Sequence, residues 1–437
     1  MTLKRIQLGL IHTAVAISLV PINSTLNRVM ITELSLSALL VAVLASLPYL
    51  FSPIQVAIGS FSDRHPIFGW RRTPYIFVGL ALCVVGVVVA PQVAFLIVEN
   101  PTLGKFIGMI AFGAWGMGYN LAAVSYLSLA TEISGPRGRS RTIAVMFFMM
   151  IVGIILTSVS LRGLLKVYSP DALKQAFLLV GMVALLMGLV GLVGLERRKT
   201  AKKDLSEEEE DHTWAAIFRS LSSNRQAIRF FIYLVLLLTA ILGQDILLEP
   251  FAAEAFDMPI HETSLITAIW GVFFLLSLTL GGLLENRVPK LVQARIAAWV
   301  GITAFGLIVV SGWLTSLVVF YLGLFLLGLA TGLSTVSNLS LMLDMTVAGK
   351  IGMFIGAWGM ANAISRLAGN LLSGVVRDTV TSISQDGVLG YIVVFTIEIG
   401  LLLVSLFILQ RVDVSLFKQQ AEEQLPYVER AAIANEG

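Results

Sequence analysis

The sequence has 437 residues, of which 57% are hydrophobic and only 13% are charged, and its formal net charge is +3. Soluble domains carry about 25% charged residues, so this composition excludes a soluble protein and predicts one whose solvent is lipid. The small net charge gives no basis for a nucleic-acid partner. The single cysteine, Cys83, excludes a disulfide or a cysteine-based metal site within one chain.

Long apolar runs follow one another along the whole chain. A helix needs about 20 mostly apolar residues to cross a bilayer, and lipid cannot satisfy the open edges of strands. The sequence therefore predicts an all-α membrane protein with twelve transmembrane helices in two six-helix halves. The predicted spans are residues 8–30, 36–59, 74–98, 104–131, 141–163, 173–195, 229–251, 263–284, 291–313, 316–343, 350–376 and 389–410.

Lysine and arginine are distributed unevenly between the two sides that these spans define. The two termini and the even-numbered loops hold 23 of these residues, whereas the odd-numbered loops and span ends hold six. Because positively charged loops stay in the cytoplasm, we predict that both termini are cytoplasmic. The remaining arginine, Arg366, falls inside a span.

The longest polar segment separates spans six and seven and divides the chain. We expect residues 1–195 to form an N-terminal six-helix half and residues 229–412 a C-terminal six-helix half. Residues 196–228 are then a cytoplasmic linker loop, and residues 413–437 a cytoplasmic tail.

The loops after spans two and eight share a pattern, as a duplicated half would produce. Gly59-x-x-x-Asp63 matches Gly281-x-x-x-Glu285, and a proline and a later arginine follow in both loops. Two six-helix halves of parallel topology are the arrangement of the major facilitator superfamily, whose signature between helices two and three the first loop resembles. The resemblance implies a cytoplasmic latch that locks helix ends in one conformation; alternatively, the arginines only set the topology. The latch candidates are Gly59, Asp63, Arg71, Arg72, Glu132, Arg141 and Glu285.

The pentapeptide Gly-Ala-Trp-Gly-Met occurs twice, at residues 113–117 and 356–360. The two copies fall in spans four and eleven, which are not equivalent under the duplication, so the repeat does not explain them. Their small residues let two helix backbones approach closely in lipid. Each tryptophan, Trp115 or Trp358, either fills a packing groove or forms the wall of a site for a flat ligand.

Charged residues inside the predicted spans cost roughly 2.5–3.5 kcal/mol or more at the bilayer centre unless they are paired. Asp245 and Arg366 each lie 16 residues from the cytoplasmic start of their spans, which places both about 24 Å deep. Equal depth predicts an ion pair, which either is structural or belongs to a substrate or proton site. Glu249 is expected at the outer interface. The charge-pair or coupling candidates are Arg28, Glu33, Asp245, Glu249 and Arg366.

Several strings together resemble one family. Residues 25–31 read Thr-Leu-Asn-Arg-Val-Met-Ile, residues 69–76 read Gly-Trp-Arg-Arg-Thr-Pro-Tyr-Ile, and residues 355–378 contain the second Gly-Ala-Trp-Gly string. These strings resemble the bacteriochlorophyll-delivery family, the PucC-like and LhaA-like proteins of phototrophs, although Glu132 stands where that family usually has Asp. The tail after Asp413 matches little, which indicates a cyanobacterial member.

The resemblance implies a major-facilitator-type protein that delivers chlorophyll-type pigment to photosynthetic complexes or assists their assembly. It implies a thylakoid or bacterial inner membrane, with antenna, reaction-centre or photosystem subunits, chlorophyll and carotenoid as partners. A chlorin is flat and apolar, so it would favour an aromatic wall in a groove open to lipid.

Two further polar residues inside spans remain to be assigned. Glu398 lies about 20 Å inside span twelve, which is peripheral in this architecture. It is either protonated, or meets a partner helix, or ligates the magnesium of a chlorophyll. His12 is either hydrogen-bonded structure or another such ligand. The pigment- or substrate-binding candidates are His12, Asn27, Trp115, Trp358, Asn362 and Glu398.

Two rival interpretations stay open. One is a proton-coupled transporter of a small amphipathic molecule, in which Asp245, Glu249, Arg366 and also Asp344 carry the coupling. The other is a scaffold that keeps the transporter fold without transport. The sequence has no histidine pair with metal-site spacing, no nucleophile elbow and no P-loop, so we expect neither an enzyme nor a metal or nucleotide site.

Overall fold

The computed structural model describes residues 2–55, 58, 61–62, 65–196, 225–284, 287–345 and 351–417. These residues are almost entirely helical, with one isolated bridge between Ile67 and Trp70. The elements are α1 (Thr2–Ile17), η1 (Ile22–Leu26), η2 (Val29–Glu33), α2 (Ala38–Leu50), η3 (Ser52–Ile54), α4 (Thr73–Glu99), α5 (Pro101–Leu164), α6 (Pro170–Leu192), α8 (Arg225–Gly243), η4 (Gln244–Ile246), α9 (Leu248–Phe256), α10 (Ile260–Leu284), α11 (Lys290–Leu314), α12 (Leu317–Asp344), α13 (Ile351–Ser384) and α14 (Gly387–Leu409).

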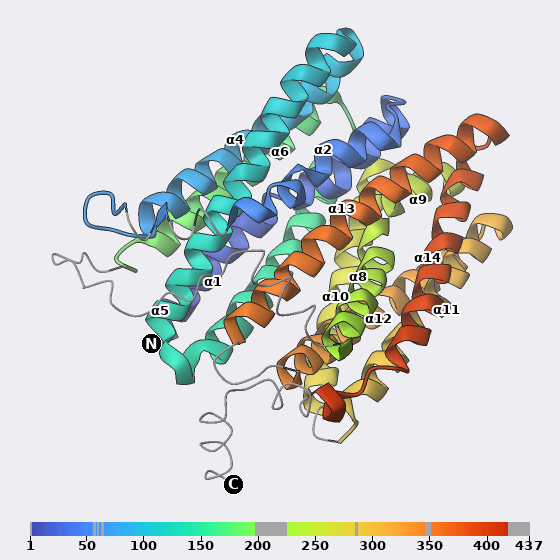
Figure 1. The fold of residues 1–437 in the computed structure, drawn as a ribbon. Helices are drawn as coiled ribbons and strands as arrows, with labels where there is room; N and C mark the ends of the chain where they lie inside the picture. The colour runs from blue at the N-terminus through green and yellow to red at the C-terminus, as the bar shows by residue number, and fades with distance from the viewer. Residues whose placement is uncertain are drawn as a thin grey trace.

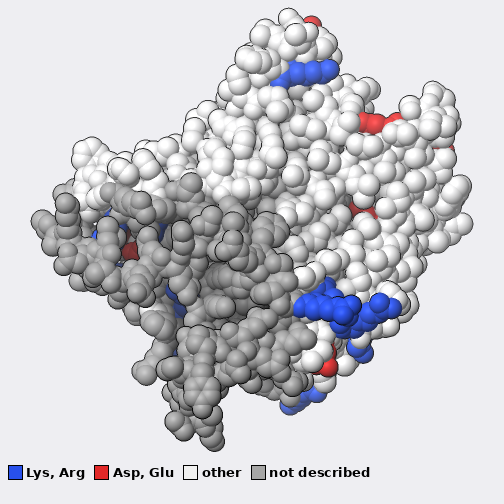
Figure 2. Space-filling view, viewed as in Figure 1, with Lys and Arg blue, Asp and Glu red and all other residues white. Residues whose placement is uncertain are grey.

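Helices occupy all twelve predicted spans. Within the described part of the chain, ten helical segments are long and apolar enough to cross a membrane. The second span is a shorter apolar segment, Ala38–Ile54, and the eleventh is α13, which has 34 residues. In the view of Figure 2, most of the described surface between the blue side chains near the top and those at the lower right carries few charges, as a lipid-facing surface requires. The prediction of an all-α membrane protein is confirmed.

Spans four and five, predicted as separate helices joined by a loop, form the single element α5. The helix changes direction at Gly135, whose φ of 63° and ψ of 175° lie outside the helical region. Glycine adopts this conformation without steric cost, and a following proline disfavours the helical conformation for the residue before it. The expected loop is therefore a kink at one residue.

Span seven, predicted as one helix over residues 229–251, is broken into α8, η4 and α9. Pro250 lacks an N–H, and its ring would clash with the carbonyl of Ile246 in a continuous helix. The break begins after Gly243, so the backbone is irregular at the depth where Asp245 lies. Irregular backbone at membrane depth occurs where it is covered by protein or lines a cavity.

The helix bundle has two ends, which we call the terminal side and the far side. The terminal side holds the N-terminal end of α1 and the first residues of α8 and α11, and the far side holds Glu33 and the first residues of α6 and α10. Two helix pairs join the first six spans to the last six: α2 packs against α13, and α5 packs against α10 (Figure 1). The pair α2–α13 carries most of the site described next.

Candidate functional site between the two halves

An ion pair lies inside the helix bundle. An Nη atom of Arg366 on α13 lies 2.8 Å from an Oδ atom of Asp245 on η4, which confirms the pair that equal depth predicted. Gln244 donates a hydrogen bond of 2.9 Å to the other oxygen of Asp245. Both partners of the ion pair keep 30% side-chain exposure, so they face a space that a ligand or water could reach.

Arg366 also contacts the other half of the molecule. Its guanidinium lies 5.4 Å from the ring centre of Tyr49 on α2, in a cation–π arrangement. One turn further along α13, Asn370 donates a hydrogen bond of 3.0 Å to Ser46. One more turn on, a Cβ added at Gly374 would lie 2.9 Å from the backbone of Leu39, so the two helices are in backbone contact there.

In the opposite direction, the same face of α13 presents two of the pigment candidates. Asn362 and Trp358 precede Arg366 by four and eight residues, which places them on one helix face. Both are half-buried, and the Asn362 amide donates a hydrogen bond of 3.0 Å to the carbonyl of Trp358. The aromatic side chain of Trp358 thus lies on the face of the helix that carries the ion pair.

Glu398 on α14 is buried rather than exposed to lipid. It is 2% exposed, and neither carboxylate oxygen has a hydrogen-bond partner among the described residues. One of these oxygens would lie 3.3 Å from a Cβ added at Gly243, so the carboxyl group points at the end of α8. The structure therefore places the Glu398 carboxyl group against the end of a neighbouring helix of the same chain.

Glu249, which was expected at the outer interface, is covered by protein. It is 2% exposed, and one of its oxygens accepts a hydrogen bond of 3.0 Å from Thr267, two turns inside α10. Glu249 lies in the short helix α9, which follows the break in span seven.

Arg28 and Glu33 form an ion pair on the far side. The Arg28 side chain is almost fully buried and donates a second hydrogen bond, of 3.0 Å, to the carbonyl of Met258 in the other half. The two hydroxyls of Thr25 and Ser264, also from different halves, lie 3.3 Å apart. These contacts join the two halves on the far side.

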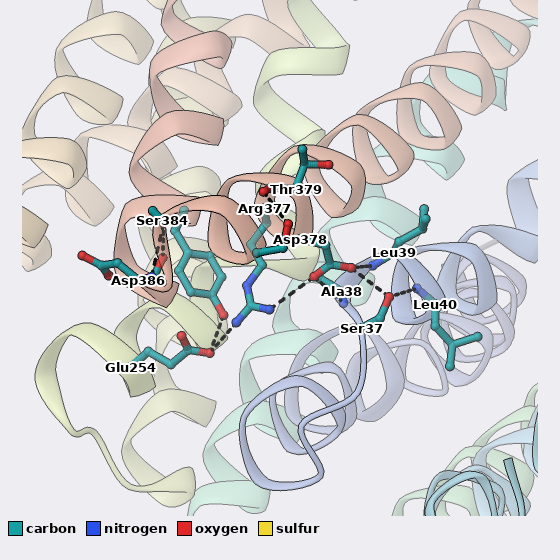
Figure 3. Close-up of polar contacts among 12 residues, drawn as sticks. Ser37, Ala38, Leu39, Leu40, Glu254, Arg377, Asp378, Thr379, Ser384 and Asp386 are labelled. Carbon is teal, nitrogen blue, oxygen red and sulfur yellow. Dashed lines mark hydrogen bonds and ion pairs between the residues drawn. The ribbon is translucent and has the colours of Figure 1, made fainter.

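A larger polar cluster on the far side was not predicted from the sequence (Figure 3). Asp378 of α13 accepts hydrogen bonds from the Ser37 hydroxyl at 2.8 Å and from the backbone N–H groups of Ala38 and Leu39 at 3.0 and 2.9 Å. It therefore caps the N-terminus of α2, a helix of the other half. We call these four residues the far-side cap.

Arg377 links the far-side cap to α9. It bonds to Asp378 at 3.2 Å and to Glu254 on α9 at 2.9 Å, and the Tyr391 hydroxyl donates to Glu254 at 2.8 Å. The sequence carried one signal, the adjacent charges Arg377 and Asp378 at a span end, but it named no partner for them.

The remaining pigment candidates lie within the first half. The His12 ring packs 5.1 Å from the rings of Tyr126 and Phe147, and its Nδ1 has no partner among the described residues. Trp115 is fully buried against Gly86 of α4, where an added Cβ would meet it at 2.5 Å. Trp115 thus fills a packing groove between helices, which is one of the two roles considered for it. Asn27 is buried and bonds to the carbonyl of Asn23 at 2.9 Å.

Part of the predicted latch is visible on the terminal side. Arg72 pairs with Glu132 at 3.3 Å and donates to the Ser62 hydroxyl at 2.6 Å. The backbone N–H of Arg71 donates to Glu196, a residue that was not predicted, while Arg141 is exposed. The candidates Gly59, Asp63 and Glu285 lie outside the described residues.

The second half has an equivalent contact. Lys290, at the start of span nine, pairs with Asp344, at the end of span ten, at 2.8 Å. Arg72 and Glu132 hold the same positions at the start of span three and the end of span four. Asp344, considered as a coupling residue, is therefore a helix-end partner and not a member of the inner site.

A family model and several known proteins match most of the length of this chain. The family model described as "PUCC protein" matches residues 25–417. The chain is 29% identical to Protein PucC of Rhodobacter capsulatus over 92% of this chain and 90% of that protein. It is 27% identical to the "Bacteriochlorophyll synthase 44.5 kDa chain" of the same species over 86% of this chain and 87% of that one.

Solved structures share the fold at low sequence identity. A bacterial homolog of the human lysosomal transporter Spinster, inward-facing and occupied, superposes with a TM-score of 0.72 at 13% identity, over 94% of this chain and 97% of that one. The nucleoside transporter NupG gives 0.71 at 16% identity, over 94% and 99%. At these identities the likeness shows the fold alone, which is that of major facilitator transporters.

Proposed function

We propose, because this chain belongs to the PUCC protein family, that it delivers chlorophyll-type pigment to photosynthetic pigment–protein complexes or assists their assembly. The observation that carries the proposal is the family match over residues 25–417, which includes both halves and the inner site. One of the similar proteins is called a chain of a bacteriochlorophyll synthase, which favours a tetrapyrrole cargo.

The proposal includes a location and partners. The chain is a multi-pass integral membrane protein, and we place it in the photosynthetic membrane with both termini in the cytoplasm, as the charge distribution predicts. Its partners are then antenna, reaction-centre or photosystem subunits, with chlorophyll and carotenoid as non-covalent cargo. In this proposal the protein binds and hands over pigment and is not an enzyme.

The inner face of α13 supplies the groups that such a cargo needs. A chlorin ring favours stacking on an aromatic side chain, and Trp358 is half-buried beside the polar Asn362 and Arg366. Ligand sites of this kind combine apolar walls with a few placed polar groups. The surroundings of Trp115 are already filled by packed helices. Trp358 is therefore the better candidate for the aromatic wall of a pigment site.

The test is an absorption spectrum of the protein purified gently from its native membrane. We expect chlorophyll or carotenoid bands, and a loss of most of the pigment in Trp358→Ala. Trp299→Ala is the matched control, because Trp299 on α11 is 57% exposed and faces away from the bundle. Colourless wild-type protein without photosynthetic partners would contradict the proposal.

A second candidate function, proton-coupled transport, is favoured by the ion pair of Asp245 and Arg366. Charges inside transmembrane helices commonly mark ion or substrate paths. The measurement is proton influx into vesicles that contain the protein, after addition of chlorophyllide as a tetrapyrrole acid. Influx that Asp245→Asn abolishes would support transport, and influx that survives this substitution would remove Asp245 from the mechanism.

A further inference from the structure

Two buried side chains at the end of α8 carry hydrogen-bond acceptors that have no donor among the described residues. Both oxygens of Glu398 and the side-chain oxygen of Gln244 are buried and have no partner in the described part of the chain. The Gln244 amide nitrogen donates to the carbonyl of Ile241 at 3.3 Å and to Asp245 at 2.9 Å. Because both of these partners are acceptors, the amide orientation is fixed and its oxygen cannot be exchanged for a donor.

An ionised carboxylate with no donor in a protein interior is expensive by several kcal/mol, whereas a carboxylic acid brings a donor of its own. One proton on Glu398 therefore removes the buried charge and gives this carboxyl group a donor of its own. Close packing leaves little room for another solution, because Gly243 and Gly369 are in backbone contact directly beside the carboxyl group.

The charged side chains of the helices around Glu398 can be followed one by one. α14 packs against α8, α9, α11 and α13. Most charged side chains of these helices have partners elsewhere: Arg377 with Glu254, Lys290 with Asp344, Glu249 with Thr267, and Arg229 with the Arg411 carbonyl. Arg295 is exposed. Asp245 lies two residues beyond Gly243, the residue that the Glu398 carboxyl group faces, and Arg366 is bound to Asp245.

We propose that Glu398 is a proton-binding site, linked electrostatically to the ion pair of Asp245 and Arg366. Glu398 is closed off at 2% exposure, whereas the ion pair keeps 30% exposure and meets Tyr49 of the other half. An anionic ligand that draws Arg366 away from Asp245 leaves the negative charge of Asp245 uncompensated beside Glu398. Proton binding and ligand binding then strengthen each other, because linkage is reciprocal.

This inference does not depend on the cargo of the protein, so it can fail or succeed independently of pigment delivery. The direct test is infrared spectroscopy of purified wild-type protein at neutral pH. We expect a C=O stretching band of a protonated carboxylic acid that disappears in Glu398→Gln. Glu254→Gln is the matched control, since Glu254 is a partly buried acid of the same half with Arg377 and Tyr391 as partners. It should leave the band unchanged.

The electrostatic link between Glu398 and the ion pair is tested by the pH dependence of the same band. Removing the neighbouring negative charge in Asp245→Asn should shift the loss of the band to lower pH, because the ionised form of Glu398 then meets less repulsion. Gln has the shape of the neutral acid, so Glu398→Gln should fold, and Glu398→Asp should retain a displaced band. A Glu398→Gln spectrum identical to that of the wild type would overturn the proton site, and an unchanged titration in Asp245→Asn would overturn the link.

Discussion

Arg366 is the residue at which the two halves and the inner acids meet. It bonds to Asp245 of its own half and stacks on Tyr49 of the other, at a depth where an unpaired charge is costly. Its position followed from counting residues along two helices, which is a local property of the sequence. The contact with Tyr49 did not, because it depends on how α2 and α13 cross.

The ion pair predicts the stability of three variants. Asp245→Asn should lower the free energy of unfolding by about 1–3 kcal/mol, less than for a fully closed pair, because both side chains keep 30% exposure. The double variant Asp245→Asn/Arg366→Gln should recover part of this loss, since it removes the unpaired charge. Thermal unfolding in detergent measures the two single variants, Asp245→Asn and Arg366→Gln, and the double variant. Additive losses in the double variant would contradict a direct interaction.

At the scale of the elements, two glycines allow the backbones of α8 and α13 to come into contact. A Cβ added at Gly369 would lie 2.7 Å from the Gly243 Cα and 2.8 Å from the Thr239 carbonyl oxygen. Both are backbone atoms, so neither can move aside without displacing a helix. The Glu398 carboxyl group lies beside the same contact, at the end of α8.

Substitution by alanine should therefore have opposite effects at two glycines of α13. Gly369→Ala should destabilise the protein by about 1–3 kcal/mol, because it overpacks a backbone contact. Gly359→Ala, with no described atom within 4 Å of the added Cβ, should be neutral or stabilise by up to about 1 kcal/mol through helix propensity. Melting temperatures of the two variants in one detergent provide the comparison. Equal shifts would show that the α8–α13 contact is not tight.

For the whole molecule, the far side is closed by contacts that cross from one half to the other. The far-side cap, the Arg28–Met258 hydrogen bond and the Thr25–Ser264 contact all lie there. The twelve spans, the ion pair and the family resemblance were accessible from composition, depth and short strings. The cap on α2 was not, because no periodicity relates Asp378 to Ala38, 340 residues apart. The burial of Glu398 and Glu249 likewise depends on packing and on a helix break.

The far-side cap predicts how opening of the molecule is controlled. Asp378→Ala removes one of the two caps of α2, the one that comes from the other half, which costs about 1–2 kcal/mol and raises the open population by roughly 5- to 30-fold. The measurement is the labelling rate of Ser264→Cys by a water-soluble maleimide; the native Cys83 is buried. Asp386→Ala is the control, because Asp386 caps α14 within one half by accepting from Leu389. Equal labelling in both variants would exclude a gating role for Asp378.

The far-side cap also has a consequence for biosynthesis. The chain is made from its N-terminus, so α2 leaves the ribosome about 340 residues before Asp378 exists. At roughly 5–20 residues per second this interval lasts about 20–70 s. During that time Ser37, which bonds to the Leu40 N–H at 3.2 Å, is the only one of the two caps available to α2. The first half is thus inserted with an unfinished helix end, and translation of α13 is the step that completes it.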